Sequence, residues 1–116
     1  MTITGSCHCG AIAYTLDEEV PTKAVSCNCS ICRRKAGLLH FTTPETFTLE
    51  TSRDAITTYT FKTHHIQHQF CKTCGCAPFS EGAGPDGKPA MAINLRCADG
   101  VDLDALEIQH FDSAKL

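Results

Sequence analysis

Three cysteines lie close together in residues 27–32, which read Cys27-Asn28-Cys29-Ser30-Ile31-Cys32. Two more closely spaced pairs flank this stretch at a distance, Cys7-x-Cys9 on the N-terminal side and Cys71-x2-Cys74 on the C-terminal side. Cysteines separated by one or two residues are typical of tetrahedral metal sites. The three clusters therefore predict a fold that is held together by metal-binding knuckles.

The cysteine count argues against a disulfide framework. The chain has 116 residues and nine cysteines, and the two outside the three clusters are Cys76 and Cys97. An odd number cannot pair completely within one chain, and the N-terminal residues lack the basic flank and apolar stretch of a secretory signal. Close spacing without an export signal favours metal binding in a reducing compartment, so we expect a cytoplasmic protein.

Charge and length narrow the function classes further. The formal net charge is −3, and the only dense basic cluster is Arg33-Arg34-Lys35, so nucleic acid is not an expected partner. No apolar run approaches the roughly 20 residues of a membrane-spanning helix, so no membrane partner is expected. The length is that of one domain, and we predict that residues 1–116 form a single zinc-binding domain. The sequence does not indicate whether the protein has a protein partner.

Short runs rich in Thr, Phe, Ile and Tyr, separated by turn residues, predict a mainly β fold of small sheets. Residues 81–89 contain five Gly or Pro and are expected to form a loop. One helical turn is expected over Ser30–Lys35, closed by Gly37, and a short helix over residues 102–106. The expected strands are residues 10–16, 21–26, 38–43, 46–49, 55–61, 66–70, 89–95 and 107–111.

The two outer cysteine pairs together offer four thiolates, which is the donor set of a closed structural zinc site. We expect the first pair to be extended, so that Cys7 and Cys9 direct their sulfurs to the same side. Gly75 follows the second pair directly and can adopt the positive φ that a tight knuckle needs. We therefore predict a structural zinc on Cys7, Cys9, Cys71 and Cys74, whose binding contributes directly to folding.

The central cluster, Cys27, Cys29 and Cys32, offers only three thiolates. Three protein ligands and an open fourth position are the arrangement of a catalytic zinc. A closed site with a fourth ligand from elsewhere fits the spacing equally well, and the candidates are Cys76, Cys97, His64, His65 and His68. An iron–sulfur cluster or a Cu(I) site is a weaker interpretation, because the mixed spacing suits a mononuclear tetrahedral site.

Charged neighbours of the central cluster are candidate site residues. Arg33 and Arg34 directly follow Cys32 and could offset the charge of the thiolates or bind a substrate carboxylate with two hydrogen bonds. A solvated basic turn explains either arginine equally well. His64, His65 and His68 could include a general acid or base, but the polar outer face of a strand is the favoured interpretation for each.

The sequence resembles the glutathione-dependent formaldehyde-activating enzyme family, which includes the centromere-protein-V-like proteins. The resemblance covers nearly the whole chain and rests on the three cysteine clusters in this order. The matching segments are Gly5-Ser-Cys-His-Cys-Gly-Ala-Ile12, Cys27-Asn-Cys-Ser-Ile-Cys-Arg-Arg-Lys-Ala-Gly37, Phe70-Cys-Lys-Thr-Cys-Gly75, Tyr59-Thr-Phe61 and Ile93-Asn-Leu-Arg-Cys-Ala-Asp-Gly-Val-Asp-Leu103.

The resemblance implies the fold called Mss-four-like and two Zn2+ ions per chain. It implies a structural zinc on the four outer cysteines and a second zinc, with an exchangeable position, on Cys27, Cys29 and Cys32. The implied activity is that of a carbon–sulfur lyase, in which glutathione adds to formaldehyde to give S-hydroxymethylglutathione. The implied partners are a small thiol such as glutathione and an aldehyde, and Arg33 or Arg34 could pair with a glutathione carboxylate.

Two other functions fit the same residues. The first is a non-enzymatic, zinc-stabilised protein-interaction module, because a fold does not fix a function. The second is a metal-handling or redox role in which Cys76 or Cys97 serves as a spare thiol.

Overall fold

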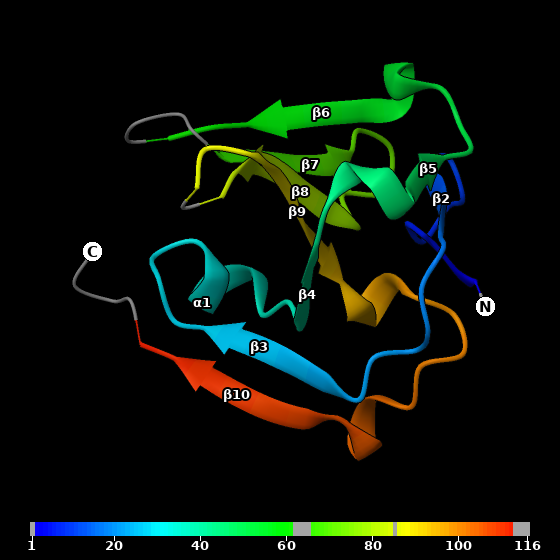
Figure 1. The fold of residues 1–116 in the computed structure, drawn as a ribbon. Coiled ribbons are helices and arrows are strands. Elements are labelled where there is room, and N and C mark those ends of the chain that lie inside the picture. The colour runs from blue at the N-terminus through cyan, green and yellow to red at the C-terminus, as the bar shows by residue number, and fades with distance from the viewer. Residues whose placement is uncertain (1, 62–65, 85, 113–116) are drawn as a thin grey trace.

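The computed structural model describes residues 2–61, 66–84 and 86–112 and has two β-sheets, which confirms the predicted mainly β fold. Within these residues, no helix has the length and apolar character to cross a membrane. The helical segments are α1 (Cys32–Lys35) and four 3-10 turns at Pro44–Thr46, Arg53–Ala55, Leu95–Cys97 and Leu103–Ala105. The strands (Figure 1) are β1 (Ile3–Ser6), β2 (Ala13–Leu16), β3 (Lys23–Cys27), β4 (Leu39–Thr42), β5 (Phe47–Leu49), β6 (Ile56–Tyr59), β7 (Ile66–Cys71), β8 (Phe79–Ala83), β9 (Pro89–Asn94) and β10 (Glu107–Phe111).

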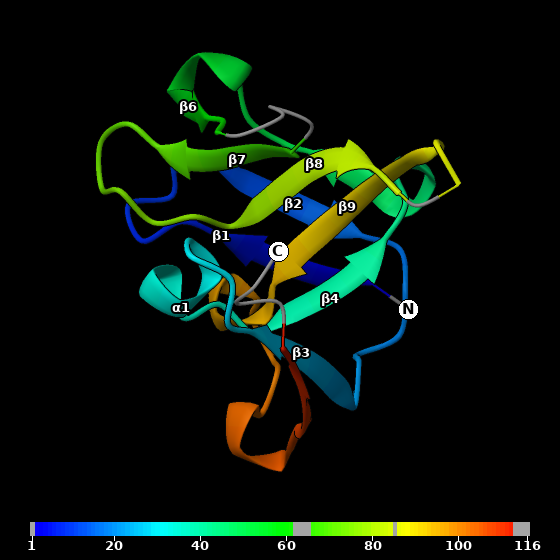
Figure 2. The same ribbon diagram turned by 90° about the vertical axis from the view of Figure 1, so that its left-hand side faces the viewer.

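The two sheets form two layers. The smaller sheet has the strand order β1-β2-β5, and the larger one has the order β10-β3-β4-β9-β8-β7-β6. All pairings are antiparallel except that of β10 with β3. Figure 2 shows β1 and β2 behind β7, β8, β9 and β4, whereas α1 lies toward the viewer. The larger sheet therefore has one face toward the small sheet and one face toward α1.

The hydrophobic core lies between the two layers. Tyr14 from the small sheet and Phe79 from the large sheet both contact Phe47, with ring centroids 5.4 and 4.9 Å from it. Met91 and Ile93 are buried on β9, and the alternation of a strand turns their neighbours, Ala92 and Asn94, to the opposite face. That opposite face is available for a binding site.

The fold differs from the sequence predictions in several places. The strand β1 and the start of β8, at Phe79 and Ser80, were not predicted. Residues 81–83 belong to β8 rather than to a loop, because Glu81 and Gly82 pair with Met91 and Ala90 and thereby satisfy their backbone groups despite poor strand propensity. The turn after α1 is closed by Ala36, which has a φ of 58°, and not by Gly37.

Candidate metal centres

The structure brings the four outer cysteines into one group. One sulfur from each of Cys7, Cys9, Cys71 and Cys74 lies within 4.8 Å of the others. The Sγ atoms of Cys7 and Cys9 are 3.7 Å apart, and those of Cys9 and Cys71 are 3.6 Å apart. Four ligands at 2.3 Å from a tetrahedral metal lie about 3.8 Å from one another. All nine cysteines are free thiols, so the spacing and the donor chemistry both fit a metal ion.

Two tight turns create this group. Cys7 and Cys9 follow β1 in a turn, so the prediction that the pair is extended is wrong. Its sulfurs converge because the chain reverses there, with Gly10 N–H donating to the Cys7 carbonyl at 3.3 Å and Gly10 at a φ of 85°. In the second turn, Gly75 N–H donates to the Cys71 carbonyl at 2.9 Å, and Gly75 has a φ of 80°, which confirms its predicted conformation.

Backbone N–H groups point at the sulfurs of this group. The N–H of Ile12 donates to Cys7 Sγ at 3.3 Å, and the N–H of Thr73 donates to Cys71 Sγ at 3.3 Å. Backbone N–H groups of Cys76 and Cys9 hold the pKa of the Cys74 thiol at about 5. Hydrogen bonds of this kind favour the charged form of a thiol, which is the form that binds metal.

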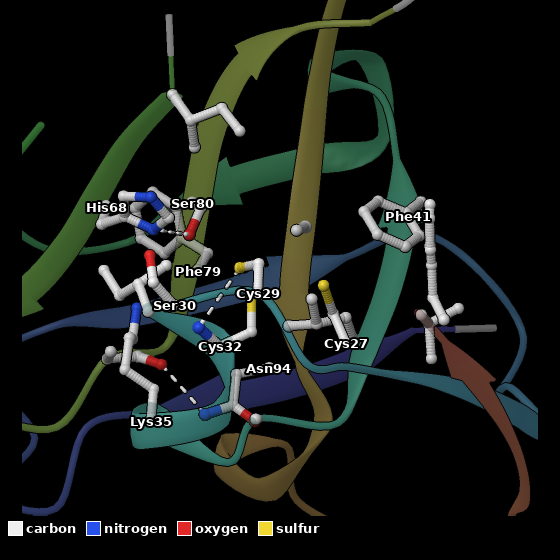
Figure 3. A pocket seen from close by; sticks show the side chains of 18 of the residues that line it. Cys27, Cys29, Ser30, Cys32, Lys35, Phe41, His68, Phe79, Ser80 and Asn94 are labelled. Atoms are coloured by element: carbon white, nitrogen blue, oxygen red, sulfur yellow. Dashed lines mark hydrogen bonds between the residues drawn. The ribbon is translucent and has the colours of Figure 1, made fainter. Parts of the chain in front are cut away.

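The central cysteines form a second group, with the sulfurs of Cys27, Cys29 and Cys32 within 4.8 Å of one another (Figure 3). Cys27 ends β3, Cys29 lies in the turn that follows, and Cys32 begins α1. Burial and a hydrogen bond with Cys29 raise the pKa of Cys32. Burial alone would also raise the pKa of Cys29, but the backbone N–H of Cys32 and other hydrogen bonds lower it. Three thiols this close need a counter-charge to ionise together, and a soft divalent metal supplies one.

Among the residues that the structure describes, none of the proposed fourth ligands joins this group. In the part of the chain that the structure describes, no additional His, Cys, Asp or Glu atom lies within the same 4.8 Å. Cys97 Sγ instead lies 3.8 Å from Asn94 Nδ2, and Cys76 packs against the hydrophobic core. His64 and His65 are outside the described residues. His68 lies in the neighbouring pocket but is not a member of the group.

A pocket of about 910 Å³ adjoins the three-cysteine group on the face of the large sheet that α1 partly covers. The register of the sheet places its wall residues in two rows that cross the strands. The first row is His68, Ser80, Ala92 and Phe41, on β7, β8, β9 and β4. The second row is Gln109, Val25, Leu39 and Asn94, on β10, β3, β4 and β9. The sulfurs of Cys27, Cys29 and Cys32 complete one side.

The polar lining of the pocket includes Lys35, His68 and Ser80 (Figure 3), and also Ser30, Asn94, Gln109, His110 and Asp112. His68 is buried, so the interpretation of it as an outer-face residue is wrong. Its Nδ1 lies 3.3 Å from Ser80 Oγ, and Phe61 stacks on its ring at 5.6 Å between centroids. Burial, reinforced by the charge of Lys35, lowers the pKa of His68. Partial desolvation of its ammonium group at the pocket lowers the pKa of Lys35, although the residue as a whole is exposed.

Arg33 and Arg34 are exposed and are absent from the pocket lining among the described residues. Arg34 Nη1 donates instead to the Ser30 carbonyl at 2.6 Å. Lys35 is the member of the basic cluster that faces the pocket. The sequence could have indicated this orientation, because Lys35 is three residues after Cys32 and residues i and i+3 share a face of a helix.

Comparison with known proteins agrees with this architecture. A model of the family described as "glutathione-dependent formaldehyde-activating enzyme" matches residues 2–110. The chain belongs to this family. A Halomonas elongata protein that carries the same family's name is 46% identical over 37 residues, which are 32% of this chain. The match spans only 24% of that relative's length.

A solved structure shares the fold of this family member. The crystal structure of a Rhodobacter sphaeroides protein matches with a TM-score of 0.76 and covers 91% of this chain and 99% of the other. The two sequences are 24% identical, so this likeness concerns the fold alone.

Proposed function

We propose that this protein is a zinc-dependent carbon–sulfur lyase that joins a small thiol such as glutathione to an aldehyde, or cleaves the resulting adduct. The observation that carries the proposal is the convergence of Cys27, Cys29 and Cys32 at the side of a pocket large enough for such an adduct. Membership of the glutathione-dependent formaldehyde-activating enzyme family supports the substrate class.

The proposal includes two zinc ions per chain within a single domain, residues 1–116. The group of Cys7, Cys9, Cys71 and Cys74 would hold the structural ion, because its four sulfurs complete a tetrahedral shell. The group of three would hold the second ion and leave one position for a ligand. Nine free thiols and a thiol substrate both suit a reducing compartment, so we propose that the reaction takes place in the cytoplasm.

The reaction is an addition without oxidation or reduction. A C–S bond forms, the carbonyl π bond breaks, and the thiol proton ends on the carbonyl oxygen; cleavage is the reverse. Zinc, when bound, supplies stabilisation of the thiolate form of the substrate at neutral pH. The ammonium group of Lys35 faces the same pocket and stabilises negative charge on the substrate oxygen or sulfur.

The His68–Ser80 pair orients the carbonyl oxygen in this proposal. The lowered pKa of His68, caused by its burial and by Lys35, favours the neutral form of its ring. Neutral His68 with a proton on Nδ1 donates to Ser80 Oγ at 3.3 Å, which leaves the Ser80 proton for a substrate oxygen. Burial of His68 limits the access of water to this hydrogen bond and strengthens it.

The test compares Cys29→Ser and Cys32→Ser with Cys97→Ser as a matched control outside both sulfur groups. The assay measures glutathione–formaldehyde exchange above the uncatalysed rate, together with zinc content and circular dichroism. We expect the first two variants to fall to the uncatalysed rate and lose one zinc while they keep the fold, and the control to retain turnover. Full turnover in the folded Cys29→Ser and Cys32→Ser variants would overturn the proposal.

A further inference from the structure

We infer that the pocket selects adducts of an aldehyde that carries an aromatic ring or an alkyl chain of several carbons, in preference to the one-carbon adduct of formaldehyde. This inference rests on the proposed function, because it names the substrate class of the same site. It comes from the distribution of apolar and polar side chains around the three-cysteine group.

Large apolar side chains gather at this pocket although they are accessible to solvent. Phe41 on β4 is 59% exposed, Ile66 on β7 is 50% exposed, and Phe111 on β10 is 46% exposed. All three line the pocket. Exposed apolar groups that cluster at one cavity mark a binding surface, whereas scattered ones need no explanation.

Lys35 and Phe41 lie at opposite ends of the pocket, and both ends carry apolar and polar side chains. Figure 3 shows Lys35, Ser30, His68, Ser80 and Phe79 on one side and Phe41 beyond Cys27 on the other. Ile66, two positions before His68 on β7, and Phe61, stacked on His68, line the first end, whereas His110 and Asp112 line the pocket beside Phe111. The parallel register of β10 and β3 pairs Phe111 with Cys27, and the register of β4 and β9 places Phe41 beside the small side chain of Ala92. A substrate held near the three sulfurs therefore has an apolar wall on the side away from Lys35.

The small substrates of the proposed reaction do not account for this wall. Formaldehyde adds one carbon and almost no apolar surface. Glutathione carries two carboxylates and an ammonium group, whereas the lining formed by residues 2–61, 66–84 and 86–112 has Lys35 as its only Lys or Arg and Asp112 as its only Asp or Glu. The volume of about 910 Å³ lies near the upper end of the roughly 300–1,000 Å³ typical of small-molecule sites. An apolar group on the aldehyde carbon would fill the remaining space.

Binding of stable thioether analogues tests the inference without turnover. S-methylglutathione and S-hexylglutathione share every charged group and differ by five methylenes, each of which contributes about fourfold in affinity when fully buried. Partial burial at an open wall should still make S-hexylglutathione at least about tenfold tighter in calorimetry with zinc-loaded protein. We expect Phe41→Ala and Phe111→Ala to remove most of this preference. The matched control is Val20→Ala, an exposed apolar residue outside the lining.

Equal affinity for the two analogues would overturn the inference, as would a preference that survives both phenylalanine substitutions. A second measurement separates it from the lyase proposal by comparing kcat/KM for the glutathione adducts of formaldehyde, hexanal and phenylacetaldehyde. We expect the larger adducts to be at least about tenfold better. Cleavage of the formaldehyde adduct at equal or higher efficiency would contradict the inference and leave the lyase intact. A strong S-hexyl preference without any cleavage would support the apolar site and overturn the lyase.

Discussion

The sulfurs of Cys9 and Cys71 lie 3.6 Å apart although 62 positions separate the two residues along the chain. The contact joins the turn after β1 in the small sheet to the end of β7 in the large sheet. Cys7 and Cys71 are buried there and belong to the hydrophobic core. The outer cysteine group therefore connects the two layers of the fold, and closing so long a loop has an entropic cost that a bound metal can offset.

Cys71→Ser should abolish cooperative unfolding or lower the Tm severely, because binding of a structural zinc contributes directly to the folding free energy of a small domain. Circular dichroism melts and zinc content measure this effect. Cys76→Ser is the matched control, since Cys76 lies outside the group of four and its replacement should preserve the zinc. An unchanged melt and zinc content for Cys71→Ser would contradict the structural role.

Ala36→Gly should stabilise the protein by about 0.5–1 kcal/mol. Ala36 closes α1 with a φ of 58°, a conformation that costs an L-residue about 1–2 kcal/mol and glycine almost nothing. The greater conformational freedom of glycine in the unfolded chain offsets about 0.4–1 kcal/mol of that stabilisation. Urea melts at neutral pH measure the difference, and a lower midpoint for the variant would show that this strain is absent.

Glu18→Gln should destabilise the fold near pH 7 by about 1–3 kcal/mol. Glu18 Oε1 lies 2.8 Å from His40 Nε2, and Thr42 and Thr46 donate to Oε2. Burial alone would raise the pKa of Glu18, but the hydrogen bonds from Thr42 and Thr46 and the contact with His40 lower it overall. Glu19→Gln, at an exposed neighbouring carboxylate, is the control.

The direction of the Glu18 pKa shift determines how the effect of the substitution depends on pH. A folded pKa below the unfolded value of about 4.3 gives stability that is complete above that pH and disappears as the pH falls through the lower folded value. The difference between wild type and Glu18→Gln should therefore shrink below about pH 4 in denaturant melts at matched metal content. A difference that stays constant from pH 7 to this range would rule out the charged carboxylate as its source.

Lys35→Gln should raise the KM for the thiol adduct or lower kcat by about tenfold or more, because it removes the positive charge that faces the three thiolates. Arg33→Gln removes a charge two positions away that lies outside the lining. Steady-state kinetics of the two variants distinguish the contribution of Lys35 from that of Arg33. A larger loss for Arg33→Gln would favour the arginine role predicted from the sequence over the lysine role proposed from the structure.

The cysteine groups could be predicted from the sequence because the cysteines of each cluster lie close together along the chain. The spacing Cys7-x-Cys9, Cys71-x2-Cys74 and the triplet at 27–32 predicted both groups that the structure assembles. The conformation of the first pair was predicted wrongly, because a turn and an extended strand both place two nearby sulfurs on one side. Gly75 was predicted correctly because a tight turn after two ligands favours a residue that tolerates positive φ.

The pocket could not be predicted from the sequence in the same way, because the residues that form its walls are brought together by the order of the strands in the sheet. Phe111 meets Cys27 only because β10 pairs in parallel with β3, and His68 reaches Ser80 only through the pairing of β7 with β8. Composition also misled the prediction of a loop at residues 81–89, since pairing with β9 holds Glu81–Ala83 in a strand. Long-range pairing of this kind leaves no local signal in one sequence.

Titration of glutathione into Co2+-substituted protein tests the central claim most directly. Tetrahedral cobalt–thiolate sites absorb in the visible and near-ultraviolet in a way that reports their ligands. We predict a saturable spectral change from one of two bound metals, lost in Cys29→Ser and retained in Cys97→Ser. Two metals per chain with no spectral response to glutathione or to other small thiols would contradict an exchangeable position at Cys27, Cys29 and Cys32.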